Sequence, residues 1–193
     1  MERRHMLIGM MTIVVFAAFA TLTRVMFNSP SFRGEIINPP SPAAEIKLTD
    51  QDGRPFQMSS LRGKVVLLYF GFVNCPEECP LTMAHLKQAV ETLGPAAGDL
   101  QVVMVSTDPV RDTPQALKNF LGAFNPGFIG IPGTSIQLAK IWSDFGVDVL
   151  DGGETHSSYT YVIDRQGRQR LTLTPETLPD DIAHDLKILL SED

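Results

Sequence analysis

The stretch VVLLYFGFVNCPEECPLTM, residues 65–83, places an apolar run directly before the chain's two cysteines. Its first part, Val65–Phe70, is continuously apolar with β-branched and aromatic residues, which is typical of a central strand covered on both faces. Cys75 and Cys79 follow, each directly before a proline. Apolar residues then recur at helical spacing over 81–93. We therefore expect a buried strand, a cysteine-bearing turn and a helix.

The two thiols are expected to act together. Pro76 suits the first position of a helix, so Cys75 would lie at a helix N-terminus, where the helix dipole favours the thiolate. Residues i and i+4 of a helical turn share a face, which would direct the sulfurs of Cys75 and Cys79 to the same side. Converging thiolates suit Cu(I), Zn(II) or a reversible disulfide, and the spacing alone does not distinguish these. A bridge this short would be a poor structural staple, because the loop it closes is tiny.

The other segments predict an α/β fold with a sheet covered on both faces. Residues 100–106 form a second apolar run, typical of another buried strand. Thr113 and Pro114 are suited to cap and open a helix. The remaining elements are expected as a hairpin turning at Asp52-Gly53, a helix ending at Gly146, two strands joined by a turn at Gln166-Gly167, and a last helix opened by Pro179.

The N-terminus resembles a membrane segment. Residues 6–23 carry no charge and follow Arg3 and Arg4. Such a run is about long enough to cross a bilayer as a helix, and the preceding positive charges predict that the rest of the chain is exported. We favour a single membrane anchor within residues 1–27, because the apolar run exceeds the usual length of a signal peptide's core. The alternative is a signal segment cleaved at the sequence AFA, residues 18–20.

The composition predicts one globular domain behind that segment. The chain has 193 residues, of which 44% are hydrophobic and 20% charged, a normal globular balance. Residues 28–44 are rich in Pro, Ser and Asn and are expected to form a linker, followed by one domain over 45–193. The formal net charge of −6 argues against a nucleic-acid partner, which would require a basic face.

A third ligand would favour a metal site over a redox pair. His156 lies in GGETHSSYTYVID, residues 152–164, after two glycines and before an apolar strand. In a thioredoxin-like sheet, the loop that enters this strand can lie against the cysteine turn. Imidazole is a common metal ligand, but it is also common in loops that bind nothing. From the residues alone, both interpretations of His156 stay open.

Three motifs in this order resemble the SCO/SenC family, the copper chaperones of cytochrome c oxidase assembly. They are GFVNCPEECP at 71–80, STDPVRDTP at 106–114 and HSSYTYVIDRQGR at 156–168. The likeness extends over about residues 46–190. The resemblance implies a thioredoxin-like fold and copper, as Cu(I) or Cu(II), held by Cys75, Cys79 and His156. Two thiolates and one imidazole form a soft donor set that suits Cu(I), and the nitrogen helps to tolerate Cu(II).

The resemblance also gives Asp108 two interpretations. It matches the family's loop aspartate, which could orient His156 or tune the charge of the site. An aspartate before a proline at a strand end is equally typical of ordinary turn chemistry. Asn74 and Thr155 depart from residues that are frequent in the family, and neither departure removes a ligand. Arg111, Asp112 and Thr113 could simply cap and brace the following helix.

The expected function is that of a membrane-tethered copper metallochaperone. The family resemblance implies delivery of copper to the binuclear copper site of cytochrome c oxidase subunit II, or to another copper protein, and possible reduction of the partner's cysteines. The expected location is a bacterial inner membrane, with the domain in the periplasm. The alternative is a thiol–disulfide oxidoreductase or redox sensor that uses Cys75 and Cys79. Whether the chain is an enzyme stays open at this point.

Overall fold

The structure, a computed structural model, describes residues 31–150 and 155–192, and for Thr155 and His156 it describes the backbone only. The expected membrane segment at residues 6–23 lies outside these ranges. Within them, no helix combines the length and the apolar character needed to cross a membrane. In chain order the elements are β1 (Glu35–Pro42), β2 (Lys47–Thr49), β3 (Pro55–Gln57), the 3-10 helix η1 (Met58–Leu61), β4 (Val65–Gly71), α2 (Glu78–Leu93), the 3-10 helix η2 (Gly94–Asp99), β5 (Leu100–Ser106), α3 (Pro114–Gly122), β6 (Ile129–Ile131), α4 (Ser135–Phe145), β7 (Val149–Leu150), β8 (Thr155–His156), β9 (Thr160–Ile163), β10 (Arg168–Leu173) and α5 (Pro179–Ser191).

The centre of the fold is a six-stranded sheet in the order β1-β10-β9-β4-β5-β6. Strand β4 pairs in parallel with β5, so Gly71 at its end lies opposite Ser106 at the end of β5. On its other side β4 pairs antiparallel with β9, and Tyr69 lies opposite Thr160 at the start of β9. The chain segments that follow β4, follow β5 and precede β9 therefore meet at one edge of the sheet.

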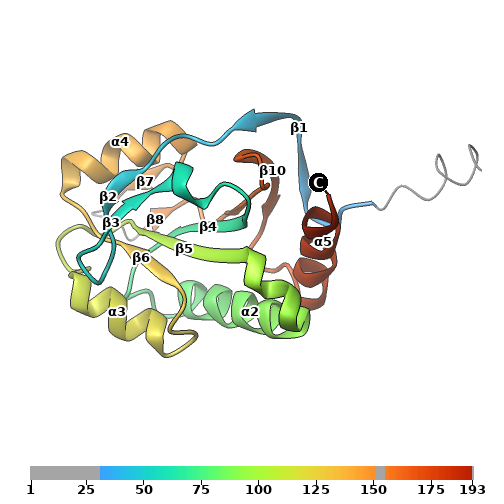
Figure 1. The fold of residues 1–193 in the computed structure, drawn as a ribbon. Helices are drawn as coiled ribbons and strands as arrows, with labels where there is room; N and C mark the ends of the chain where they lie inside the picture. The colour runs from blue at the N-terminus through green and yellow to red at the C-terminus, as the bar shows by residue number, and fades with distance from the viewer. Residues whose placement is uncertain (1–30, 151–154, 193) are drawn as a thin grey trace, which may run out of the picture. The chain divides into compact units, whose positions relative to one another are not determined.

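Side chains of β4 alternate between two cores, one on each face of the sheet. Val65, Leu67 and Tyr69 pack with buried residues of α2, α3 and α5. Val66, Leu68 and Phe70 pack with α4 and with residues around the β2–β3 hairpin. In Figure 1 the sheet accordingly lies between α4 on one side and α2 and α3 on the other. This arrangement explains why the whole of β4 is buried and why its sequence lacks a polar face.

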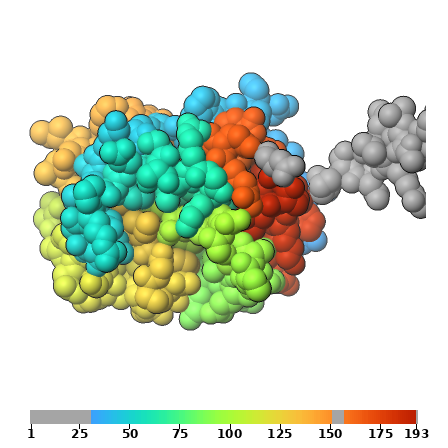
Figure 2. Space-filling model, viewed as in Figure 1, coloured from blue at the N-terminus to red at the C-terminus, as the bar shows by residue number. Residues whose placement is uncertain are grey.

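The β2–β3 hairpin, expected from its Asp52-Gly53 turn, covers part of the α4 side of the sheet. Lys47 lies opposite Gln57 in the hairpin, and Phe56 is buried in the core beneath it. The turn is stabilised by Asp50, whose Oδ1 accepts hydrogen bonds from the backbone N–H groups of Asp52 and Arg54. Figure 2 shows the atoms of this region, in cyan and teal, on the surface of the face in view.

The structure differs from the expected linker at residues 28–44, because β1 lies inside this stretch. Ile36 pairs with Leu171 and Pro42 with Arg168 of β10, in antiparallel register. Proline was the signal for a linker, yet β1 is an edge strand of the sheet. An edge strand tolerates proline, because an N–H on its outer side needs no partner strand.

The start of α3 and both ends of α4 carry capping signals in the sequence. Thr113 caps α3, since its side chain accepts a hydrogen bond from the N–H of Ala116. Thr134 and Gln137 form a reciprocal capping box at the start of α4. Helix α4 ends at Gly146, whose φ of 67° is left-handed and therefore favours glycine.

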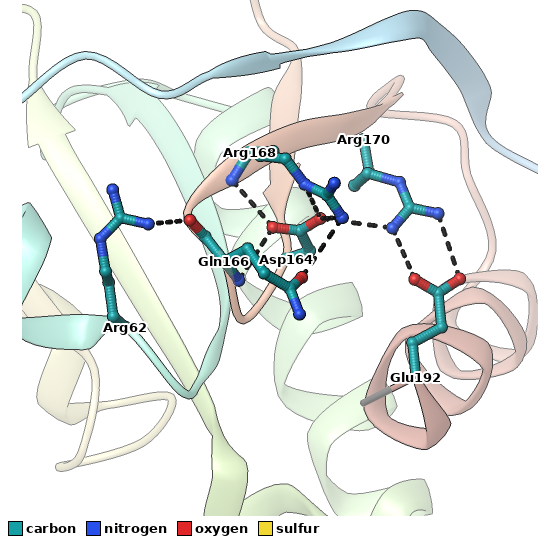
Figure 3. Close-up of polar contacts among 6 residues, drawn as sticks. All are labelled: Arg62, Asp164, Gln166, Arg168, Arg170 and Glu192. Carbon is teal, nitrogen blue, oxygen red and sulfur yellow. Dashed lines mark hydrogen bonds and ion pairs between the residues drawn. The ribbon is translucent and has the colours of Figure 1, made fainter.

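A cluster of arginines and carboxylates fastens the β9–β10 turn and the C-terminal helix. The carboxylate of Asp164 is 2% exposed and accepts a hydrogen bond from Arg168 Nε at 2.8 Å. Arg170 Nη1 donates to Asp164 Oδ2 at 3.3 Å. Both terminal nitrogens of Arg170 also donate to the carboxylate of Glu192, which follows α5. Figure 3 shows Asp164 between these groups and Arg62 donating to the carbonyl of Gln166. The cluster thus connects β10 to the end of the chain.

Asp164→Asn is expected to lower the free energy of unfolding by about 2 kcal/mol at pH 7, because charge-assisted hydrogen bonds are lost. Burial raises the pKa of Asp164 and is the largest single influence, but hydrogen bonds from Arg168 and Arg170 together bring it below the ordinary value. A lowered carboxyl pKa stabilises the fold above the unfolded pKa of about 4, and this contribution is lost as the pH falls through the folded value.

Urea unfolding at pH 7 and pH 3 tests this expectation. The difference in the free energy of unfolding between the native protein and Asp164→Asn should be smaller at pH 3 than at pH 7. Glu91→Gln is the control, since Glu91 is exposed and lies 3.9 Å from Lys87. If the free energies of unfolding of the native protein and Asp164→Asn differ equally at both pH values, the carboxylate of Asp164 does not stabilise the fold through a lowered pKa.

Candidate metal centre

The cysteine turn connects the end of β4 to the start of α2. The helix begins at Glu78, with Glu77 at its N-cap, so the expectation of a helix starting at Pro76 is wrong by two residues. A turn closed by the N–H of Cys75 and the carbonyl of Phe72, 3.3 Å apart, takes up the chain before the helix. Cys75 therefore precedes α2, and Cys79 lies in its first turn.

The two cysteines are nevertheless in contact, through a backbone-to-sulfur hydrogen bond instead of a shared helical face. The backbone N–H of Cys79 donates to Cys75 Sγ at 3.3 Å. N–H groups in the first turn of a helix have no partner within the helix, so a sulfur acceptor suits this position. Both cysteines are free thiols. The turn thus presents two sulfurs that can share a metal ion or close a disulfide.

Cys79 is held in a closely fitted environment. Its side chain is fully buried, and Tyr69 Oη, itself buried, donates to its sulfur at 3.3 Å. A Cβ atom at Gly71 would lie 2.9 Å from this sulfur and 2.5 Å from the Tyr69 ring. Gly71 therefore leaves the space that both groups occupy. Tyr69 was not selected from the sequence, although strand alternation could have placed it on the face that α2 covers.

The electrostatics of the two sulfurs differ. Burial raises the pKa of the Cys79 thiol to about 12, although hydrogen bonds from Tyr69 and from the backbone N–H of Phe72 oppose this effect. Burial also raises the pKa of Tyr69, and the neighbouring Cys79 adds to the rise. Cys75 is only partly buried, so it is the more accessible of the two cysteines. At neutral pH, Cys79 is therefore a protonated thiol, and it must lose this proton before its sulfur can bind a metal ion.

The segment that carries His156 lies beside the cysteine turn. Its backbone pairs with Val149 in the small β7–β8 sheet. Two residues later, Ser158 Oγ donates to Glu78 Oε2 at 2.6 Å, and Glu78 is the immediate neighbour of Cys79. The ligand role of His156 stays a prediction, because the structure describes only the backbone of this residue. Among side chains that are described, no three His, Cys, Asp or Glu residues gather as a metal site.

The carboxylate of Asp108 is engaged in its own loop. It is 1% exposed, and Oδ1 accepts hydrogen bonds from the N–H groups of Val110 and Arg111 at 3.3 and 3.1 Å. Its other oxygen forms an ion pair with the guanidinium of Arg111. These contacts are the turn chemistry that was one of the two interpretations of Asp108. A contact with His156 stays a prediction.

Asp112 differs from the expectation that it braces the following helix. Thr113 performs the capping alone, and the Asp112 carboxylate accepts a hydrogen bond from the N–H of Val73, which precedes the first cysteine. No local pattern in the sequence indicates this contact, because its partners are 39 residues apart. Of the motif residues, the structure thus places Cys75, Cys79 and Asp112 around one turn.

Known proteins of similar sequence include two from Rickettsia. The "SCO2-like protein" of Rickettsia felis is 34% identical over 152 residues, which cover 74% of each chain. The "SCO2-like protein RC0895" of Rickettsia conorii is 37% identical over 133 residues, covering 64% of this chain and 65% of that protein.

Solved structures resemble the fold over nearly their whole length. The apo Sco1 protein of Thermus thermophilus has a TM-score of 0.74 and 34% identity, covering 83% of this chain and 98% of that one. ScoI of Bradyrhizobium japonicum, solved with copper bound, has a TM-score of 0.71 and 31% identity, covering 77% and 99%. BsSco, described as a member of the Sco family of cytochrome c oxidase assembly proteins with a disulfide switch, has a TM-score of 0.68 and 25% identity, covering 82% and 99%. These likenesses confirm the expected thioredoxin-like α/β fold.

The SCO1/SenC family model matches residues 37–191, which include the cysteine turn, the loop after β5 and the segment of His156. This match spans most of the chain and agrees with the relatives in sequence and in fold. The chain belongs to the SCO1/SenC family.

Proposed function

We propose that this protein is a copper chaperone that binds one copper ion through Cys75, Cys79 and His156. It delivers the ion to the binuclear copper site of cytochrome c oxidase subunit II or to another copper protein. An N-terminal membrane segment would hold the domain at a bacterial inner membrane, facing the periplasm. Copper is the cargo of this reaction, and related Sco proteins have been solved with copper bound.

The observation that carries the proposal is the meeting of two free thiols with the histidine segment at one edge of the sheet. The N–H of Cys79 contacts Cys75 Sγ, and the chain after His156 is fastened to Glu78 beside Cys79. Two sulfurs and one imidazole nitrogen form a donor set that suits Cu(I). Three protein ligands also leave a coordination position for a ligand from the acceptor.

The two sulfurs have different parts in such a transfer. Cys75 is partly exposed and can be approached first, whereas Cys79 is buried beneath Tyr69. The pKa of Cys79 is raised to about 12 by burial, so capture of the ion by this sulfur releases a proton at neutral pH. Release of copper to an acceptor is favoured in turn when Cys79 regains that proton.

A second candidate function is thiol–disulfide exchange, and the same exposed and buried pair favours it. The Cys75 thiolate would attack a partner disulfide, forming a mixed disulfide and releasing one partner thiolate. Cys79, after losing its proton, would then attack Cys75 Sγ, closing the internal disulfide and releasing the second partner thiolate. Two electrons pass to the partner in these steps, and His156 has no part in them.

Cu(I) titration of the reduced protein without oxygen separates the two functions. The native protein should bind one copper ion tightly, and His156→Ala should weaken binding by more than about tenfold, because a direct ligand is lost. His184→Ala is the matched control, since His184 lies in α5 beside Asp185. Copper binding that is absent, or equally strong in His156→Ala and His184→Ala, would favour thiol exchange instead.

Alkylation of single-cysteine variants tests the difference between the sulfurs. At pH 7, Cys79→Ser leaves Cys75, which should react with iodoacetamide at least about tenfold faster than the Cys79 that remains in Cys75→Ser, because the thiolate is the reactive form. In urea the two variants should react at similar rates. Equal rates in the folded proteins would refute the assigned environments.

A further inference from the structure

The loop that follows β5 contains a buried carboxylate whose contacts lead toward the cysteines. Asp112 is 3% exposed. Its Oδ1 accepts a hydrogen bond from the backbone N–H of Val73 at 3.0 Å, and its Oδ2 accepts one from Ser106 Oγ at 2.6 Å. Both oxygens thus connect the end of β5 to the segment between β4 and Cys75.

The Val73 N–H lies where the sheet no longer supplies partners. The pairing of β4 with β5 ends at Gly71 and Ser106. Beyond this pairing, the Thr107 N–H donates to the carbonyl of Gly71 at 2.9 Å. The next hydrogen bond between the segments that follow β4 and β5 is that from the Val73 N–H to Asp112. The carboxylate therefore extends the connection between the two segments to within two residues of Cys75.

The contacts of Asp112 are not explained by the helix that follows it. Thr113 caps α3, and the turn from Asp108 is closed by the backbone N–H of Asp112 donating to the Asp108 carbonyl at 3.0 Å. Neither function uses the Asp112 carboxylate. Burial raises the pKa of this group, which means that the fold keeps the carboxylate in a place that disfavours its charge. A group retained at such a cost is typical of a functional site.

Two further contacts connect the loop after β5 to its surroundings near the cysteine turn. Ser106 Oγ, which donates to Asp112, also accepts the N–H of Asp108 at 3.0 Å. The Arg111 guanidinium lies 5.9 Å from the centre of the Phe72 ring, on the same segment that Asp112 holds. The loop after β5 therefore contacts Phe72 and Val73, which lie between β4 and Cys75.

We propose that Asp112 is a positioning residue for the thiol pair: by holding Val73, its carboxylate fixes the start of the turn and with it the place of Cys75 relative to Cys79. This inference rests on the proposed function only in taking the two thiols to act as a pair. Loss of the carboxylate should lower the effective concentration of one thiol at the other. Both disulfide closure and the sharing of a copper ion should then become less favourable.

The test compares Asp112→Ala, Asp112→Asn and Asp185→Ala in the full chain. Asp185 is a matched control, because it is 1% exposed and accepts hydrogen bonds from the backbone N–H groups of Arg33 and Gly34, in a part of the fold that includes neither cysteine. The first measurement is the equilibrium with oxidised dithiothreitol, in which two protons and two electrons pass from Cys75 and Cys79 to the reagent. The second is the dissociation constant for Cu(I).

Asp112→Ala should lower the equilibrium constant for disulfide closure by about tenfold or more and weaken Cu(I) by a similar factor, the range seen when an outer partner of a metal site is removed. Asp112→Asn, whose amide oxygen can still accept from Val73, should recover most of both values. Asp185→Ala should leave both within about twofold of the native protein, whatever its effect on urea unfolding. Amide exchange at Val73 should be protected in the native protein and faster in Asp112→Ala.

The inference is overturned if Asp112→Ala matches the native protein in both equilibria, or if Asp185→Ala shifts them equally. If Asp112→Ala does not fold, failure of Asp112→Asn to keep the Val73 amide protected, with thiol equilibria unchanged, overturns it as well. Failure of the copper proposal has a different signature, because the native protein would then bind no copper while the disulfide equilibrium still responds to Asp112.

Discussion

The arrangement of the candidate site depends on where strand β4 stops. This strand is buried on both faces and pairs in parallel with β5 and antiparallel with β9. That pairing brings the end of β4, the end of β5 and the start of β9 to one edge of the sheet. The cysteine turn, the loop with Asp112 and the segment after His156 are the continuations of these three strands. No one of them forms a site alone, and their meeting is a consequence of strand register.

At this edge the protein gives two chemically identical side chains different environments. Gly71 provides space for the sulfur of Cys79, Tyr69 donates to that sulfur, and burial raises its pKa to about 12. Cys75 receives the N–H of Cys79 and stays partly exposed. A pair with one reachable and one withheld sulfur suits the stepwise exchange of a ligand, whether that ligand is a copper ion or a partner's sulfur. The proposed role of His156 distinguishes the two, since copper binding would use this residue and thiol exchange would not.

Local patterns predicted most elements, because strands and helices here carry their own signals. The apolar run of β4, the cap Thr113 of α3 and Gly146, which directly follows α4, are each specified by neighbouring residues. The contacts that shape the site are specified by distant ones. Asp112 and Val73 are 39 residues apart, and Ser158 and Glu78 are 80 apart, so neither contact could be predicted before the strand order was known. The residues of β1 resembled a linker for the same reason. Their prolines are tolerated because β1 is the outermost strand of the sheet, and this position depends on the strand order.

The proposed function requires Cys75, Cys79 and His156 to hold one copper ion together. X-ray absorption spectroscopy of the Cu(I)-loaded protein tests this requirement, because sulfur and nitrogen neighbours of copper are distinguished by distance. We expect two sulfur neighbours and one nitrogen neighbour in the native protein, and loss of the nitrogen in His156→Ala. A spectrum with sulfur neighbours alone, or one that His156→Ala leaves unchanged, would contradict it.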